Sequence, residues 1–260
     1  MDTQKNIVFV AGAAGTGTNA FVDLLNTHSR LCIAKDRFPL QYQLQRNFSP
    51  SLFKVSRFCD LRYTDRLRVQ MPDEQGKADM DSVAEKWGSA TWVGDRFEGD
   101  LKIIEDALLA LPASRCLLAL RNLKDVAIDW DGGLARYSSG LCSAQGFAEG
   151  CSHWSKQIAR IQALVGKPEF ADRIFLVDLD HCFEHDVLVR DGILGFLGLD
   201  NDPDFITSWD SASEQARRQH MKGRKVPKDH VATYKKAMTD SIRQLRRLAM
   251  QKATHYRSFV

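Results

Sequence analysis

The feature that most constrains the fold lies between Ile7 and Leu25. Ile7–Val10 is a short run of β-branched and aromatic residues, typical of a strand buried on both faces. A loop of small residues follows at Gly12–Thr18, and apolar residues then recur with helical spacing over Asn19–Asn26. Small residues let a backbone approach a ligand closely, and the amides at the start of a helix favour an anion. This unit therefore predicts a phosphate-type binding site, and its alternative is a tight turn that binds nothing.

Short apolar runs and amphipathic stretches alternate along the rest of the chain, which predicts an α/β fold with a parallel sheet and right-handed crossovers. We expect one domain over residues 1–260, with residues 36–80 forming helices and loops over the sheet and residues 203–228 irregular. The predicted strands are Leu31–Ile33, Trp92–Gly94, Arg115–Leu120 and Arg173–Val177, and the predicted helices are Leu101–Leu111, residues 145–165, Val187–Leu197 and Asp229–Lys252.

Composition limits the class of partner. The 36 Lys and Arg against 33 Asp and Glu leave a net charge of +3, too small to indicate a nucleic-acid or membrane partner. The six cysteines are scattered without a CxxC pair, which indicates neither a disulfide framework nor a metal site. No stretch approaches the ~20 apolar residues of a membrane span, and the early glycine loop leaves no room for a signal peptide. These features predict a soluble, cytoplasmic protein.

The spacing of the loop separates the kinds of phosphate ligand. Gly12 and Gly17 stand at the P-loop interval, but Thr18 and Asn19 occupy the places where a nucleotide kinase needs Lys and then Ser or Thr. The glycines also do not follow the GxGxxG order of a dinucleotide site. An ATP-driven kinase is therefore disfavoured, although Ile174–Asp178 has the form of an apolar strand that ends in a metal-binding Asp.

Four segments together resemble the signatures of the PAPS-dependent sulfotransferase family, where PAPS is 3′-phosphoadenosine 5′-phosphosulfate. Leu117–Trp130 (LLALRNLKDVAIDW) resembles the second signature, an apolar strand ending in Arg-Asn/Asp-Pro-x-Asp-x-x-x-Ser. Ile7–Leu25 is similar to the first signature, Trp92–Phe97 to the central Gly-Asp/Glu-Lys-Thr/Ser-Pro element, and Phe175–Leu199 to a later strand and helix end. The resemblance implies a three-layer sandwich with a central parallel sheet, the P-loop NTPase-like sulfotransferase fold.

The same resemblance implies PAPS as the donor, 3′,5′-adenosine bisphosphate as its product, and no metal. The loop amides and the Thr16 and Thr18 hydroxyls would hold the 5′-phosphosulfate. Arg121 would hold the 3′-phosphate, because a guanidinium matches phosphate oxygens bidentately. Arg224 or Lys222 would add a second 3′-phosphate contact, unless this basic run is only a solvated face. The implied donor-binding set is Gly12, Gly15, Thr16, Gly17, Thr18, Asn19, Arg121, Asp129 and Arg224.

Three positions differ from the family pattern. Gly15 replaces the loop Arg or Lys that meets the bridging oxygen of the donor. Asp129 stands where the 3′-phosphate site has Ser, and it would repel a phosphate unless it is protonated, turned away or paired with a cation. Phe97-Glu98 replaces the Thr/Ser-Pro of the central element.

The difference at the loop leaves two candidates for the missing cation. Arg96, at the Lys position of the central element, or Lys35, after the second strand, would serve the sulfuryl oxygens. The alternative for Arg96 is a surface ion pair with Asp95. Asp36 is the candidate catalytic base, and its alternative role is an N-cap for a helix from residue 37 onward. Asp95 is the second candidate for the base.

The sequence thus predicts metal-independent, in-line transfer of a sulfuryl group to a hydroxyl or amine of a small-molecule or carbohydrate acceptor. Two alternatives stay open: a P-loop nucleotide kinase, and a catalytically silent or repurposed nucleotide-binding protein of the sulfotransferase fold. The segment between residues 36 and 90 interleaves aromatic and basic side chains, which fit an aromatic, sugar-like or acidic acceptor alike.

Overall fold

The structure is a computed structural model of the chain. It describes residues 5–38, 41–42, 45–60, 62, 65, 74–98, 101–132, 146–184, 186–220, 224–238 and 240–260. Lys222, one of the two alternatives for the second 3′-phosphate contact, lies outside this part of the chain.

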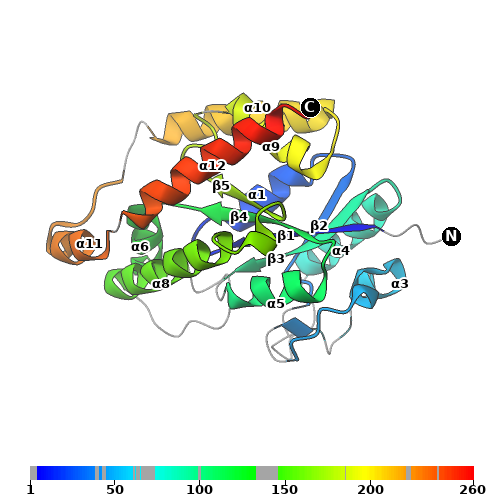
Figure 1. Cartoon of the computed structure of the whole chain (residues 1–260), viewed down its shortest axis with the longest axis horizontal. Helices are drawn as coiled ribbons and strands as arrows, with labels where there is room; N and C mark the ends of the chain where they lie inside the picture. The colour runs from blue at the N-terminus through cyan, green and yellow to red at the C-terminus, as the bar shows by residue number, and fades with distance from the viewer. Residues whose placement is uncertain are drawn as a thin grey trace.

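Five parallel strands form the central sheet in the order β2-β3-β1-β4-β5 (Figure 1). The predicted parallel sheet is confirmed, and the loop after β1 lies at the middle of its carboxyl edge. The third strand continues to Glu98, four residues past the predicted end at Gly94. The strands are β1 (Asn6–Gly12), β2 (Leu31–Lys35), β3 (Trp92–Glu98), β4 (Arg115–Leu120) and β5 (Ile174–Asp178).

Alternate residues of each strand face two separate helical layers, as the period of two in a strand requires. Phe9 and Ala11 of β1 belong to one apolar core, and Val8 and Val10 belong to the other. The first core packs against α4 (Glu74–Trp87), α5 (Lys102–Ala110), α6 (Leu123–Asp131) and α8 (Phe147–Val165). The second packs against α1 (Thr18–Leu25), α9 (Asp186–Leu197) and α10 (Pro203–His220), and α12 (Ser241–Arg257) contributes to both. The result is three layers.

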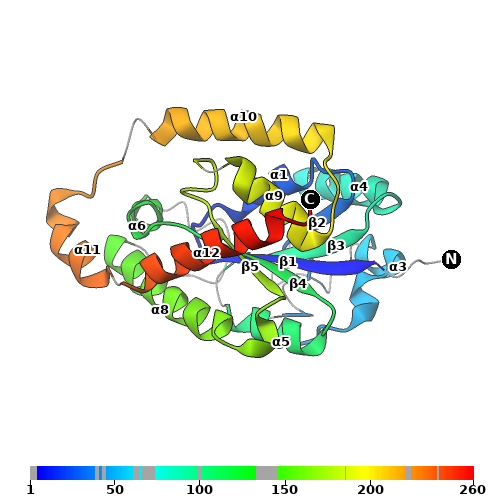
Figure 2. The same ribbon diagram turned by 45° about the horizontal axis from the view of Figure 1, so that its top comes forward.

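The prediction that residues 203–228 are irregular is wrong for residues 203–220, because Pro203–His220 forms α10, the outermost helix of its layer (Figure 2), whereas residues 224–227 form no regular element. The Asp202 carboxylate accepts hydrogen bonds from the N–H groups of Asp204 and Phe205, both at 3.1 Å, and so caps the helix. Phe205 and Trp209, one turn apart, are fully buried. These two residues form a narrow apolar stripe that anchors the helix to the core. Most other residues of the helix are polar, so the stripe is hard to recognise in the sequence.

The predicted helix Asp229–Lys252 is interrupted. The chain forms a 3-10 turn and a short helix before α12 begins at Ser241. The remaining short elements are η1 (Pro50–Phe53), α3 (Val55–Phe58), η3 (Pro168–Phe170), η4 (Lys228–His230) and α11 (Val231–Ala237).

Among the described helices, none is both long and apolar enough to cross a membrane.

Candidate functional site

The glycine loop is shaped by backbone conformations and close contacts that need glycine. Gly15 and Gly17 have φ of 85° and 87°, in the left-handed region. A Cβ at Gly12 would lie 2.4 Å from Oγ1 of Thr16, so the loop folds directly over this position. Gly17 is the N-cap of α1 and has no side chain to cap it, which leaves the first-turn amides without a side-chain acceptor. These amides are therefore open to an anion.

Two threonines of the loop are buried, with Thr16 3% and Thr18 1% exposed. The hydroxyl of Thr16 has no hydrogen-bond partner among the described residues. A buried hydroxyl without a partner costs about 1–3 kcal/mol, so an unpaired one at this loop points to a ligand. The Asn19 side chain, by contrast, is exposed to solvent.

Arg96 reaches the loop from β3 and is 2% exposed. Its Nη1 donates to Oγ1 of Thr18 at 3.3 Å, and its guanidinium pairs with the carboxylates of Asp36 and Glu98. Its Nε has no partner within the described part of the chain. The surface ion pair with Asp95 does not form, because alternate residues of β3 face opposite layers.

Asp36 lies at the end of β2 in a left-handed conformation with φ of 53°, which is unusual for a residue with a side chain. Although 38% of the Asp36 side chain is exposed, partial desolvation raises the pKa of Asp36 to about 6, with Arg96 opposing this rise and Glu98 adding to it. The carboxylate bonds Arg96. The predicted candidate base and candidate cation are thus in direct contact.

Asp95, the reserve candidate for the base, is fully buried on the other side of the sheet. It accepts hydrogen bonds from the N–H groups of Arg37, Phe38 and Arg96 at 2.9–3.1 Å. Burial raises the pKa of Asp95 to about 8. Asp95 therefore takes the Arg37 and Phe38 amides, and among the described residues no amide hydrogen bond to the Asp36 carboxylate supports its N-cap alternative.

Lys35, the other candidate cation, forms an ion pair with Asp23 on α1. Its ammonium is therefore held by Asp23, whereas the Arg96 guanidinium contacts Thr18 at the loop. Of the two candidates, only Arg96 meets the loop in this structure.

Glu98 is a site residue that the sequence analysis missed. Its Oε1 accepts a hydrogen bond from the Gly15 N–H at 2.9 Å, and its Oε2 accepts one from Nη1 of Arg96 at 2.8 Å. Glu98 pairs in register with Gly12, the last residue of β1, so its side chain starts at the base of the loop. Its spacing of two from Arg96 is the signal that would have found it, because residues i and i+2 of a strand share a face.

Arg121 contacts the carbonyl group of Gly15, whereas Glu98 contacts its N–H group. Its Nη1 donates to the Gly15 carbonyl oxygen at 2.7 Å and to Oδ2 of Asp129 at 2.8 Å. Arg224 bonds the second oxygen of the same Asp129 carboxylate. Asp129 is therefore paired with two cations, one of the three arrangements in which a carboxylate is tolerable at a phosphate site.

Two tryptophans hold the backbone of the loop and of Arg121 in place through hydrogen bonds. Nε1 of Trp130 donates to the Ala14 carbonyl oxygen at 3.1 Å, and Nε1 of Trp154 donates to the Arg121 carbonyl oxygen at 2.9 Å. Helices α6 and α8 approach closely at Gly150, where a Cβ would lie 2.9 Å from Cβ of Trp130. The close helix contact thus fixes both the loop and the arginine.

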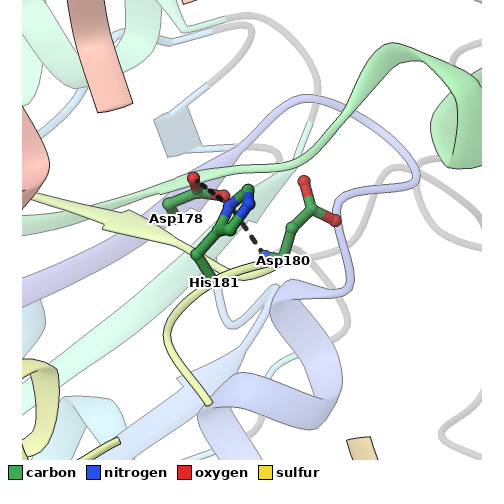
Figure 3. A group of neighbouring side chains, drawn as sticks. All are labelled: Asp178, Asp180 and His181. Atoms are coloured by element: carbon green, nitrogen blue, oxygen red, sulfur yellow. Dashed lines mark hydrogen bonds and ion pairs between the residues drawn. The ribbon is translucent and has the colours of Figure 1, made fainter. Parts of the chain in front are cut away.

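A second cluster of ionisable groups follows β5. The His181 imidazole bonds the Asp178 carboxylate at 2.8 Å, and the Asp180 N–H donates to the same carboxylate at 3.2 Å (Figure 3). These three side chains lie close enough together to hold a metal ion. However, the Arg246 guanidinium lies 2.9 Å from Asp178 and 2.7 Å from Asp180, so its single positive charge is already shared between the two carboxylates.

This arrangement bears on the kinase alternative. Asp178 ends β5, which is separated from β1 by β4, and its carboxylate is engaged by His181 and Arg246. This carboxylate is therefore already occupied and is not free to ligate a metal beside the glycine loop.

The cluster predicts a pH dependence of stability. The hydrogen bond to Asp178 raises the pKa of His181 above 6.5. The stabilisation is complete below the unfolded pKa near 6.5 and is lost as pH rises through the higher folded pKa. His181→Gln should therefore lower the melting temperature more at pH 5.5 than at pH 9. The exposed His255→Gln serves as control, and an equal loss at both pH values for His181→Gln would contradict the assignment.

The aromatic residues that the structure describes between β2 and α4 are buried in the core. Each of the five that the structure describes is at most 5% exposed, and they pack on one another with ring centroids 5.2–6.4 Å apart. They are core residues of the layer that contains α4 and α5. These five residues are Phe38, Tyr42, Phe48, Phe53 and Phe58.

Comparison with known proteins gives the fold a name. No protein-family model matches the sequence, and a search of curated proteins finds no match. The sulfotransferase domain from the curacin biosynthetic pathway matches with a TM-score of 0.54 and 13% identity, over 94% of this chain and 97% of that domain. The sulfotransferase domain from the Synechococcus PCC 7002 olefin synthase matches with a TM-score of 0.51 and 16% identity, over 96% of this chain and 97% of that domain. The likeness confirms the sulfotransferase fold that the sequence resemblance implied.

Proposed function

We propose that this chain is a sulfotransferase that binds PAPS and transfers its sulfuryl group to a hydroxyl or amine of a small-molecule or carbohydrate acceptor. The observation that carries the proposal is the convergence of two cationic groups on Gly15. The Gly15 N–H donates to Glu98, which in turn accepts from Arg96. The Gly15 carbonyl oxygen accepts from Arg121, and both Arg121 and Arg224 bond Asp129. A donor with separate 5′ and 3′ anionic groups needs an arginine near each of them.

The residues of the loop fit the 5′ group of this donor. The Thr16 hydroxyl is buried without a partner, and the first-turn amides of α1 have no side-chain cap. In the proposal these groups, with Thr18, hold the phosphosulfate oxygens. Arg121 and Arg224 hold the 3′-phosphate.

The donor supplies an activated sulfuryl group, whose sulfur–oxygen bond to the phosphate breaks as the acceptor oxygen or nitrogen bonds sulfur. Asp36 is the proposed base that takes the proton of the acceptor. Its pKa of about 6 leaves it ionised at neutral pH but close enough to that pH to be an effective base. Arg96 is the proposed cation for the sulfuryl oxygens, and its bond to Asp36 keeps the two groups side by side.

Thermal stabilisation tests donor binding. A ligand at 100 times its Kd adds about 2.7 kcal/mol of stability, which is about 5–10 °C in melting temperature for a chain of this length. We expect this shift with 3′,5′-adenosine bisphosphate in the absence of Mg²⁺, and a much smaller one with ATP and Mg²⁺. The reverse order would favour the P-loop nucleotide kinase.

A second candidate function is a nucleotide-binding protein of the same fold that does not catalyse transfer. It is favoured by Gly15, which supplies no cation, and by the Glu98 carboxylate on the Gly15 amide. Donor labelled in its sulfuryl group distinguishes the two functions. Transfer of label to any acceptor, with loss of transfer in Arg121→Ala, rejects the silent protein. Tight binding of 3′,5′-adenosine bisphosphate without transfer to a broad acceptor panel rejects the enzyme.

A further inference from the structure

We propose that Glu98 is an internal competitor for the anionic ligand of the loop and thereby sets the affinity of the site. Its carboxylate holds the Gly15 N–H and one arm of the Arg96 guanidinium, and it leaves both when the phosphosulfate group binds. This inference rests on the proposed function for the identity of that ligand.

The geometry of Glu98 is that of a bound oxyanion. Its two oxygens accept from a loop amide at 2.9 Å and from a guanidinium at 2.8 Å, and its side chain is only 4% exposed. Charge-assisted hydrogen bonds of this kind are roughly twice as strong as neutral ones. An incoming oxyanion needs the same two donors, and neither Gly15 N–H nor Nη1 of Arg96 can serve both acceptors fully.

The balance of charge adds to this competition. Arg96 contacts two carboxylates, Asp36 and Glu98, so the group of three carries one excess negative charge when all are ionised. A donor anion brought beside Glu98 would meet a like charge in a poorly hydrated site, where repulsion is strong. If Glu98 withdraws, Arg96 keeps Asp36 and gains the anion, which restores the pairing of the guanidinium.

The reason why Glu98 sits at the loop is its place in the sheet. It ends β3 in register with Gly12, and it points to the same side as Arg96. Proline at this position, as in the family pattern, would offer no acceptor to the Gly15 amide. Glu98 is therefore a feature of this chain that changes how the loop meets an anion.

The test compares Glu98→Gln and Glu98→Ala with the wild-type chain. Glu105→Gln is the matched control, because it makes the same charge change on α5, where Glu105 pairs with Lys167. Calorimetric titration measures binding of 3′,5′-adenosine bisphosphate and of inorganic pyrophosphate, both without Mg²⁺. We expect both Glu98 variants to bind both anions about tenfold more tightly than wild type, a difference of about 1.4 kcal/mol. The control should stay within about twofold of wild type.

The outcomes separate this inference from the proposed function. If wild type binds the bisphosphate and the Glu98 variants bind it no more tightly, the competitor role is wrong and donor binding stands. If pyrophosphate binds the variants more tightly but the bisphosphate binds none of the proteins, Glu98 competes with anions and the proposed donor is wrong. If neither anion binds any protein, both fail. Unchanged binding with loss of sulfuryl transfer in Glu98→Gln would make Glu98 a catalytic base and overturn the competitor role.

Discussion

Replacing Arg96 with methionine is expected to destabilise the protein by about 3–5 kcal/mol at neutral pH, the usual effect of removing one partner from a buried ion pair. The change leaves the carboxylates of Asp36 and Glu98 without their shared guanidinium. For a chain of this length the melting temperature should fall by about 6–20 °C. Scanning calorimetry on the purified variant measures the shift.

The pH dependence of this loss identifies its cause. The pKa of Asp36 is about 6 even with Arg96 present, and removing the cation raises it further. An acid whose pKa is higher in the folded than in the unfolded state costs stability when it is ionised. That cost disappears as pH falls below the folded pKa. The variant should therefore lie closer to wild type at pH 5 than at pH 8. A loss that is equal at both pH values would mean that lost packing, not unpaired charge, is responsible.

Arg96→Lys and a double variant complete the comparison. Lysine keeps one positive charge but not the planar fork that bonds two carboxylates, so its loss of stability should be intermediate. Combining Arg96→Met with Glu98→Gln should recover part of the loss, because one of the two unpaired charges is gone. No recovery in the double variant would show that Glu98 does not depend on Arg96.

Much of the fold could be predicted because local pattern and tertiary environment agree in it. Ile7–Val10 and Cys116–Leu120 are continuous apolar runs, which a strand buried on both faces explains well, and both lie in central strands. Pro203–His220 could not be recognised as a helix from its composition. Two buried aromatic residues and the Asp202 cap hold this helix in place. Because most of its other residues are polar, these few signals give no clear amphipathic pattern in the sequence.

The candidate site divides in the same way. The loop and Arg121 follow from short motifs, and the structure brings them within one hydrogen bond of each other at Gly15. Glu98 was missed because the polar residues after Gly94 conceal the continuation of β3, and only cross-strand register brings its carboxylate to the loop. The spacing of two from Arg96 indicates only that the two side chains share a face. The pairing of β3 with β1, which brings Glu98 to the loop, joins residues far apart in sequence and is not predicted by a local pattern.

Arg121→Ala is expected to weaken binding of 3′,5′-adenosine bisphosphate by about 10–100-fold, since a hydrogen bond to a charged group contributes about 1.5–3 kcal/mol. The loss has two parts in our proposal: Arg121 no longer holds the 3′-phosphate, and Asp129 keeps only Arg224 as a partner. Isothermal titration without Mg²⁺ measures the change. Arg243→Ala, at a surface ion pair with Asp240, removes the same charge elsewhere and should bind like wild type.

Asp129→Asn distinguishes the two parts because it should act in the opposite direction. It removes the carboxylate that occupies both Arg121 and Arg224, so that both guanidinium groups become available to a phosphate. We expect about tenfold tighter binding of the bisphosphate than in wild type. Weaker binding would mean that Asp129 is needed to hold the two arginines in position, and unchanged binding would mean that the 3′-phosphate lies elsewhere. In the double variant Arg121→Ala, Asp129→Asn, affinity above that of Arg121→Ala alone would assign the difference to repulsion by Asp129.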